Sequence, residues 1–317
     1  MGTAQEARGG GPVTRLAVLV PGGRGQVGSE LTARLGARPG ALVHAPGSAE
    51  LDITDAEAVR DAVDSFAEAA RDADLNPVVI NSAAYTAVDA AESDPRAAAR
   101  VNAEGPATLS AACAAGDLPL LHVSTDYVFS GDGTKPYLPT DEPGPRTAYG
   151  RTKLEGEEAV LASGARAWVV RTAWVYGARG GNFVKTMARV AAQRDVLRVV
   201  DDQVGSPTWA ADLAGGLLQL AERVAQGSGP KSRILHCTNA GETTWFAFAR
   251  AVFAELGLDP ERISPCTTEE YPVATPRPTY SVLSGEAWQE AGLTPLRPWR
   301  EALAAAFATD GPALSAG

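Results

Sequence analysis

Tyr149 and Lys153 are the pair of side chains in this sequence best suited to catalysis. Residues spaced four apart lie on one face of a helix, so the phenol and the ammonium are neighbours if this stretch is helical. An adjacent ammonium, with a cationic nicotinamide close by, lowers the pKa of a phenol from about 10 toward neutrality. Such a phenol can act as the general acid when a ketone is reduced. The pair alone can also arise by chance.

A glycine-rich turn stands near the start of the chain, with Gly22, Gly25 and Gly28 in a Gly-x-x-Gly-x-x-Gly pattern. Glycines let the backbone approach a pyrophosphate, and the helix that follows offers unpaired N–H groups and positive potential. The alternative is a tight strand-to-helix turn without a ligand. Its position after the first predicted strand favours dinucleotide binding.

The part of the sequence that distinguishes NADH from NADPH is less informative. Asp52 is placed to accept a hydrogen bond from an adenine amine, and it is equally well an ordinary carboxylate at a helix entry. The second predicted strand ends at residues 44–48, where neither a carboxylate for a 2′-hydroxyl nor an arginine for a 2′-phosphate occurs. Both NADPH and NADH therefore remain open as cofactors.

Hydroxyl groups follow another predicted strand, in the stretch Ser124-Thr125-Asp126-Tyr127-Val128-Phe129. At the carboxyl end of a parallel strand they would point into the ligand crevice, where Thr125 could hydrogen-bond a reacting carbonyl oxygen. Taken alone, this stretch is also consistent with a polar strand end that caps its own turn.

These motifs require a scaffold of alternating strands and helices, and the sequence predicts one. Short β-rich runs alternate with Ala-rich helical stretches, which indicates an α/β fold with a Rossmann-type doubly wound parallel sheet. Strands are predicted at 16–20, 41–44, 77–80, 120–124, 167–171 and 196–200. Helices are predicted up to about 35 and at 56–72, 95–115, 148–162 and 183–194.

After residue 201 the alternation weakens, which indicates a smaller C-terminal substrate-binding lobe over the carboxyl ends of the strands. Helices at 211–224, 244–256 and 298–308 and a strand at 234–237 are expected there. We divide the chain into a disordered lead-in (1–14), a mainly NAD(P)-binding Rossmann domain (15–180), a mainly substrate-binding lobe with some return to the sheet (181–308) and a tail resembling the lead-in (309–317).

Composition excludes several classes of function. Lys and Arg total 28 against 38 Asp and Glu, a net charge of −10, which argues against general nucleic-acid binding. Cys113, Cys237 and Cys266 show no close pairing, as is typical of a reducing compartment. No apolar run is long enough to span a membrane, and residues 1–14 lack the apolar stretch of a signal peptide. A cytoplasmic location is expected.

Together these motifs resemble the extended short-chain dehydrogenases/reductases, and more narrowly the dTDP-4-dehydrorhamnose reductase family. The resemblance rests on the glycine turn, residues 81–89, the Ser-Thr-Asp-Tyr-Val-Phe stretch and Tyr-x-x-x-Lys. It extends to 171–177, 182–187, 202–208, 239–246 and Arg277-Pro278 followed by Ser281, and covers about residues 15–308.

The resemblance implies a set of site residues. The catalytic set would be Thr125, Tyr149 and Lys153, with Asp126, Tyr127 and Trp174 lining the sugar site. Trp174 is a stacking platform for a pyranose in this interpretation and a core residue in the alternative. The cofactor would contact, besides Tyr149, Lys153 and the three turn glycines, a further set: Gln26, Val27, Asp52, Ile53, Ser82, Ala83, Ala84 and Val123.

The function that the resemblance implies is reduction of the C4 keto group of dTDP-4-dehydro-6-deoxy-L-mannose to dTDP-L-rhamnose, with NADPH or NADH. One alternative is another dTDP-4-keto-deoxysugar, as in dihydrostreptose synthesis, and a remote one is a non-catalytic cofactor-binding regulatory subunit. Some relatives hold magnesium between subunits through several glutamates. Glu30 matches one such position but Ala211 occupies another, so no metal is expected. The resemblance also admits a homodimer.

Overall fold

The computed structural model describes residues 15–271 and 273–315, so the predicted lead-in lies outside the described residues. Its central element is a six-stranded sheet with all neighbouring strands parallel. The spatial order is β2 (Leu42–His44), β1 (Leu16–Leu19), β3 (Asn76–Asn81), β4 (Leu120–Thr125), β5 (Ala167–Thr172) and β10 (Ile234–His236). The direction of winding reverses between β1 and β3, where open α/β sheets bind their ligands. The predicted fold class is confirmed.

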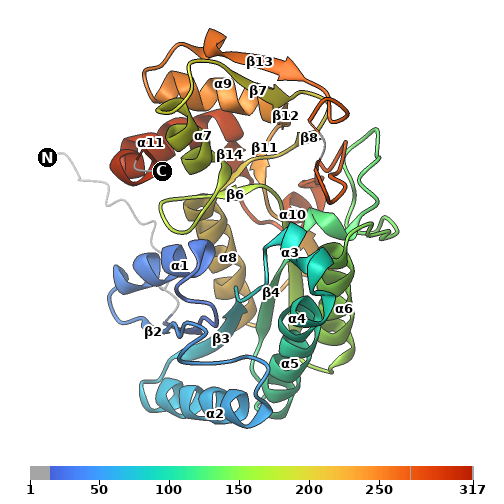
Figure 1. The fold of residues 1–317 in the computed structure, drawn as a ribbon. Helices are drawn as coiled ribbons and strands as arrows, with labels where there is room; N and C mark the ends of the chain where they lie inside the picture. The colour runs from blue at the N-terminus through green and yellow to red at the C-terminus, as the bar shows by residue number, and fades with distance from the viewer. Residues whose placement is uncertain (1–14, 272, 316–317) are drawn as a thin grey trace, which may run out of the picture.

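Helices cover both faces of this sheet because its strands are apolar on both sides. Along β1, Leu16 and Val18 belong to one core cluster, whereas Ala17 and Leu19 belong to the other. The first cluster is covered by α1 (Gln26–Gly36) and α8 (Ala210–Ala225), and the second by α2 (Ala56–Asp72), α5 (Gly105–Ala115) and α6 (Ala148–Ala162). Figure 1 shows these layers. Between β3 and α5 lie α3 (Val88–Ser93), α4 (Pro95–Ala99) and the π-helix η1 (Arg100–Glu104).

A second lobe stands beyond the carboxyl ends of the strands, in the upper half of Figure 1. Its core lies among α7 (Phe183–Ala191), α9 (Trp245–Glu255), α11 (Trp299–Ser315) and the parallel pair β7 (Leu197–Val200) and β13 (Ile263–Cys266). Three short pairs complete it: β6 (Val175–Tyr176) with β9 (Thr208–Trp209), β8 (Val204–Gly205) with β12 (Thr243–Thr244), and β11 (Asn239–Ala240) with β14 (Leu296–Pro298). The remaining elements are α10 (Glu286–Glu290) and the 3₁₀ turns η2 (Asp126–Val128) and η3 (Pro260–Arg262).

The structure differs from the sequence predictions in three places. The helix predicted at 95–115 is interrupted by the π-helix η1, where the Asn102 side chain bonds both the N–H and the carbonyl of Tyr85. The strand predicted at 196–200 pairs with β13 in the second lobe, and β10 is the sixth strand of the main sheet. The last helix continues through Ser315, because Leu303, Ala306 and Leu314 are buried in the second core. The tail predicted from residue 309 is therefore helical as far as it is described.

In the described part of the chain, no helix is both long and apolar enough to cross a lipid bilayer. The three cysteines are all buried as free thiols.

Candidate active site

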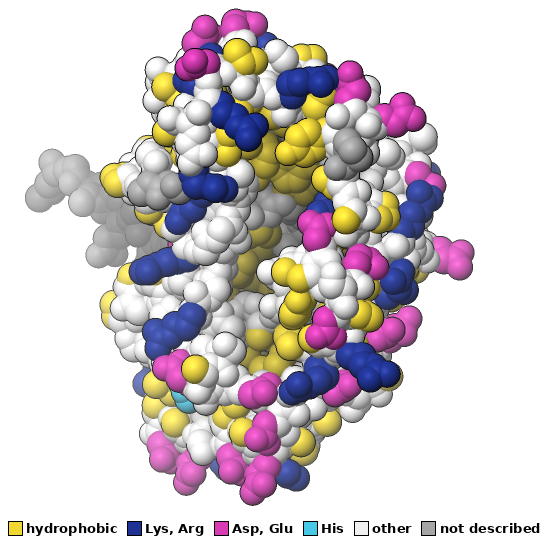
Figure 2. Space-filling view, viewed as in Figure 1, with side chains coloured by type: hydrophobic (Ala, Val, Ile, Leu, Met, Phe, Trp, Pro, Cys, Tyr) yellow, Lys and Arg dark blue, Asp and Glu magenta, His cyan; other side chains and the backbone are white. Residues whose placement is uncertain are grey.

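A cavity of about 630 Å³ lies between the two lobes, at the carboxyl ends of β1, β3, β4 and β5. Figure 2 shows the corresponding hollow, with apolar side chains in its depth. The described residues that line it come from the glycine turn, the strand ends, the start of α6 and the second lobe. They include Gln26, Ser82, Thr125, Asp126, Tyr127, Tyr149, Lys153, Trp174, Gln203, Trp245 and Arg277.

The glycine turn is shaped by close backbone packing. Gly22 has φ +80°, and a Cβ atom there would lie 2.6 Å from the backbone nitrogen of Ala83. A Cβ atom on Gly28 would overlap the carbonyl oxygen of Gly22. Helix α1 begins at Gln26 with Gly25 as its N-cap, and no side chain caps it. The glycines of the turn therefore expose backbone beside a helix N-terminus, which fits the pyrophosphate of a dinucleotide.

The predicted cofactor residues separate into two groups. Gly25, Gln26, Val27, Ser82, Ala84 and Val123 line the cavity together with Tyr149 and Lys153. Gly22, Gly28 and Ala83 lie behind this surface and shape the turn. Asp52 and Ile53 lie outside the cavity. The Asp52 carboxylate accepts from the backbone N–H and hydroxyl of Thr54, which lower its pKa, and Ile53 packs against Gly105. A contact of Asp52 or Ile53 with adenine remains a prediction.

Tyr149 and Lys153 lie in the first turns of α6, which Thr147 caps by accepting from the backbone N–H of Gly150. Gly150 allows the helix to press against the carbonyl of Tyr127, where a side chain would clash. The start of α6 is thereby held against the end of β4. Both functional side chains are buried, and Lys153 Nζ donates to the Val123 carbonyl at 2.8 Å.

The lowering of the Tyr149 pKa by Lys153 and a cationic nicotinamide remains a prediction, and burial of the phenol opposes it. Burial raises the pKa of Tyr149 to about 12, against a hydrogen bond with Thr125 that lowers it. The ammonium of Lys153 donates to the Val123 carbonyl in this arrangement. Burial also lowers the pKa of Lys153 to about 8, while the nearby Glu157 carboxylate raises it. Desolvation outweighs the Thr125 hydrogen bond at Tyr149 and the Glu157 charge at Lys153.

Thr125 and Asp126 form a buried pair at the end of β4. The Thr125 hydroxyl donates to Asp126 Oδ1 at 2.9 Å, and Asp126 Oδ2 has no partner among the described residues. Burial raises the pKa of Asp126 to about 6, although the nearby hydroxyls of Ser281 and Thr125 lower it. The next residue, Tyr127, meets the ring of Tyr149 edge-on with centroids 5.4 Å apart. The structure thus brings Thr125, Asp126, Tyr127 and Tyr149 together.

Trp174 lies between β5 and β6 in the left-handed backbone region, at φ +47°. A bulky residue there is strained, and such strain concentrates at functional sites. Its ring stacks on Trp245 with centroids 3.5 Å apart, and Gly205 leaves room for its edge. Trp174 lines the cavity as predicted, but one face of the ring is already covered. Trp245, which the sequence reasoning did not single out, lines the same cavity.

Sequence reasoning also missed two charged groups near the ligand crevice. The Arg24 side chain, from the glycine turn, packs against Gly47 after β2 and pairs with Glu50 at 2.9 Å. Arg277 reaches the cavity from the second lobe. Arg277 belongs to a stretch that matches the family motifs, and that match was the available signal. Arg24 stood inside a motif interpreted only through its glycines.

Among the residues that the structure describes, no group of three or more His, Cys, Asp and Glu side chains could hold a metal ion. Glu30 is only partly buried, and burial together with Asp310 raises its pKa. The expectation of no metal remains a prediction.

Comparison with known proteins identifies the family. Residues 16–310 match the RmlD substrate-binding domain. A dTDP-4-dehydrorhamnose reductase of Mycolicibacterium smegmatis is 49% identical, with 93% of this chain and 88% of that protein covered. A dTDP-4-keto-6-deoxy-D-glucose reductase of Streptomyces niveus is 41% identical, with 91% and 96% covered. The crystal structure of a dTDP-4-dehydrorhamnose reductase from Bacillus anthracis in complex with NADP has a TM-score of 0.84 at 32% identity, covering 93% of this chain and 100% of that one.

The chain therefore belongs to the family defined by the RmlD substrate-binding domain, and the resemblance inferred from the motifs is confirmed.

Proposed function

We propose that this protein is an NAD(P)H-dependent reductase that converts the C4 ketone of dTDP-4-dehydro-6-deoxy-L-mannose to the alcohol of dTDP-L-rhamnose. The observation that carries the proposal is the meeting of Thr125, Tyr149 and Lys153 in one cavity that begins at the glycine turn. Relatives named for this reaction, together covering nearly the whole chain, support the choice of substrate.

In this proposal the residues divide the work at the ketone oxygen. The nicotinamide cofactor supplies a hydride to C4 when bound. Tyr149 delivers a proton to the developing alkoxide, and the Thr125 hydroxyl bonds the same oxygen, so that charge never accumulates unpaired. Lys153 fixes the cofactor ribose, and its positive charge favours the phenolate that Tyr149 becomes. Burial of these groups strengthens each electrostatic interaction.

The pair of Arg24 and Glu50 supports the use of both NADPH and NADH. Arg24 lies against Gly47, at the end of β2, where a dinucleotide places its adenosine ribose. Its guanidinium suits a 2′-phosphate, and the carboxylate of Glu50 beside it suits a 2′-hydroxyl. Glu50 is held there by the backbone N–H of Gly47 at 2.6 Å. A guanidinium suited to a 2′-phosphate and a carboxylate suited to a 2′-hydroxyl therefore lie side by side.

The alternative substrate is another dTDP-4-keto-deoxysugar. The similarity to the Streptomyces niveus reductase supports this alternative substrate, because that relative is named for a different sugar. The catalytic groups act only at C4 and its oxygen, so they are equally suited to either sugar. The choice depends on contacts with the other ring positions.

A homodimer and a cytoplasmic location belong to the same proposal. The free thiols of Cys113, Cys237 and Cys266 suit a reducing compartment. Light scattering of the purified protein tests the dimer directly.

The deciding experiment offers the purified protein NADPH and, in parallel, several dTDP-4-keto-6-deoxysugars. We expect NADPH oxidation with the L-mannose-configured ketone, giving dTDP-L-rhamnose by NMR. Faster turnover of another ketosugar would favour the alternative. Tight cofactor binding without turnover of any ketosugar would favour the regulatory subunit and overturn the proposal.

A further inference from the structure

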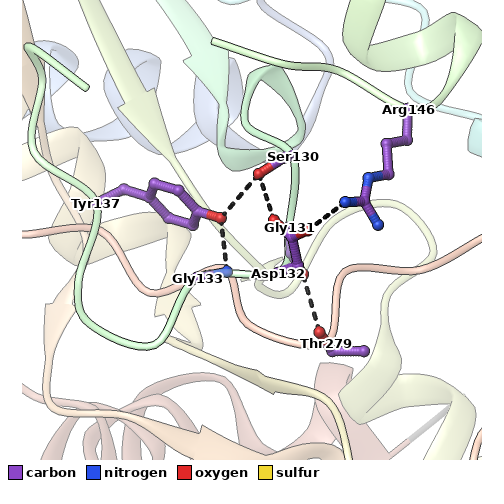
Figure 3. A network of polar contacts seen from close by, with 7 residues as sticks. All are labelled: Ser130, Gly131, Asp132, Gly133, Tyr137, Arg146 and Thr279. Atoms are coloured by element: carbon purple, nitrogen blue, oxygen red, sulfur yellow. Dashed lines mark hydrogen bonds and ion pairs between the residues drawn. The ribbon is translucent and has the colours of Figure 1, made fainter. Parts of the chain in front are cut away.

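Arg277 belongs to the second lobe, but its side chain is hydrogen-bonded to the first. Its Nη2 donates to both carboxylate oxygens of Asp89, in α3, at 2.8 and 2.7 Å. Two residues after Arg277, the Thr279 hydroxyl donates to the Gly131 carbonyl at 3.1 Å, as Figure 3 shows. The segment is therefore held across the ligand crevice at two points.

The other terminal nitrogen of this guanidinium is not satisfied. Arg277 Nη1 is buried and has no hydrogen-bond partner among the described residues. Guanidinium remains charged at all physiological pH values, and a buried charged donor without an acceptor is unfavourable. Arg277 also lines the cavity that contains Thr125, Tyr149 and Trp174. The missing acceptor is therefore expected to be an anionic group of a ligand in this cavity.

Charge within the cavity points to the same conclusion. Of the described residues that line it, only Lys153 and Arg277 carry a positive charge. Lys153 is engaged with the Val123 carbonyl beside Tyr149, at the catalytic end. The protein as a whole carries a net charge of −10, so an anionic substrate needs a local cation. Arg277 is the cation available for it.

The position of Arg277 relative to Tyr149 suits the shape of a nucleotide sugar. The rings of Tyr127 and Tyr149 meet at 5.4 Å, and Arg277 and Asp89 lie close enough to Tyr127 to act on its phenol. Tyr127 thus neighbours both the proton donor Tyr149 and Arg277. In a pyranose, C1 and C4 are opposite corners of the ring. With C4 at Tyr149, the diphosphate on C1 leaves the ring on the far side.

We propose that Arg277 binds the diphosphate of the nucleotide-sugar substrate and that Asp89 holds its guanidinium in position. The inference rests on the proposed function for the identity of the substrate. A guanidinium presents parallel N–H groups that match phosphate oxygens, and Asp89 occupies one terminal nitrogen while leaving the other for the ligand.

The experiment measures binding of dTDP and of thymidine by calorimetry, without any reducible group. We expect the wild type to bind dTDP at least tenfold more tightly than thymidine. Arg277→Gln should weaken dTDP binding by about tenfold to a hundredfold, as expected for a hydrogen bond to a charged group. Binding of thymidine and of NADPH should change less than twofold.

Arg146 provides the matched control. It lines a small neighbouring cavity together with Arg277, and it is paired with Asp132, as drawn in Figure 3. Arg146→Gln should leave dTDP affinity unchanged. Asp89→Asn should weaken dTDP binding less than Arg277→Gln does, because the guanidinium remains but is less firmly held.

Two results would overturn the assignment: an Arg277→Gln variant that binds dTDP within twofold of wild type, or a wild type that does not prefer dTDP to thymidine. If the Gln variant does not fold, as its melting curve would show, Arg277→Lys decides by whether dTDP affinity falls at least fivefold. Intact dTDP discrimination without turnover of any 4-ketosugar would contradict the proposed function and leave the role of Arg277 standing.

Discussion

The Thr125 hydroxyl donates its hydrogen bond to Oδ1 of Asp126, 2.9 Å away. A hydroxyl has one proton to donate, so a Thr125 that serves Asp126 can only accept from the Tyr149 phenol. When Asp126 is protonated, it can itself donate to Thr125, and the threonine proton becomes available to Tyr149 or to a substrate oxygen. The protonation state of Asp126 thus governs which way the hydrogen bonds run at the catalytic end of the cavity.

Asp126→Asn tests the raised pKa of this carboxyl group. The folded-state pKa of about 6 lies above the ordinary value of 3.8. The contribution of Asp126 to stability is therefore fully present below the unfolded pKa and is lost as pH rises through about 6. In urea unfolding, the free energy of unfolding of the wild type should fall by roughly 2 kcal/mol relative to that of Asp126→Asn between about pH 4 and pH 7.

Asp64→Asn, on the exposed side of α2, is the control. The pH dependence of its free energy of unfolding should match that of the wild type. If the free energies of unfolding of wild type and Asp126→Asn changed in parallel with pH, the pKa of Asp126 would not be raised despite its burial.

Tyr149→Phe removes the phenol oxygen but keeps the ring that packs against Tyr127. General acid catalysis contributes about 10²–10⁴-fold, so kcat should fall within that range. The dissociation constants of NADPH and dTDP should remain close to wild type, because the ring and the cavity walls are unchanged. A variant that retains more than about half of the wild-type kcat would show that another group delivers the proton.

The positions of these groups were predictable where local pattern decides them. The i, i+4 spacing of Tyr149 and Lys153, the glycine turn and the polar end of β4 each depend on a single strand-to-helix connection. The burial that dominates their pKa values depends on the packing of both lobes, which no local pattern contains. For that reason the sequence contains no sign of the burial that opposes the lowering expected for the Tyr149 pKa.

Long-range pairing explains the other differences. Residues 196–200 and 234–237 both read as short apolar strands, and only tertiary contacts assign β10 to the main sheet and β7 to the second lobe. Arg24 meets Gly47, and Arg277 meets Asp89, across connections whose geometry the sequence does not fix. Positioning contacts of this kind therefore appear only in the folded structure.

Arg171 and Glu157 form a buried ion pair behind Lys153, and its removal should be costly. Arg171 donates to both carboxylate oxygens, with Nη2 to Oε2 at 2.6 Å, and both side chains are almost fully buried. Arg171→Met or Glu157→Gln alone should each cost about 3–5 kcal/mol in urea unfolding, because a charge is left unpaired. The double variant should cost clearly less than the sum.

If the stability losses of the two single variants added up to that of the double variant, the two side chains would not act as a pair. Glu157→Gln should also lower the pKa of Lys153, because the Glu157 carboxylate raises it in the wild type. The pH profile of kcat provides that second measurement.

Arg24→Gln tests whether Arg24 contacts the 2′-phosphate on the adenosine ribose of NADPH. Loss of the guanidinium should weaken NADPH about three- to tenfold and leave NADH nearly unchanged, a modest effect because the site is solvent-exposed. Glu50→Gln should act in the opposite direction, improving the preference for NADPH. Calorimetry with ADP-ribose and its 2′-phosphate gives the same comparison without catalysis. Equal losses for both ligands would place Arg24 away from the 2′-position.

Trp174→Ala distinguishes a sugar platform from a packing residue. Its ring stacks on Trp245 on one face and borders the cavity, so both roles are represented in its surroundings. If the sugar packs against it, losing the ring should cost on the order of 1–3 kcal/mol of binding and raise the KM of the nucleotide sugar about tenfold or more. The KM of the cofactor should barely move.

If Trp174 is instead a core residue, its truncation should cost about 3–5 kcal/mol of stability. A Trp174→Ala protein that melts far below wild type yet keeps its KM for the sugar would remove Trp174 from the substrate site.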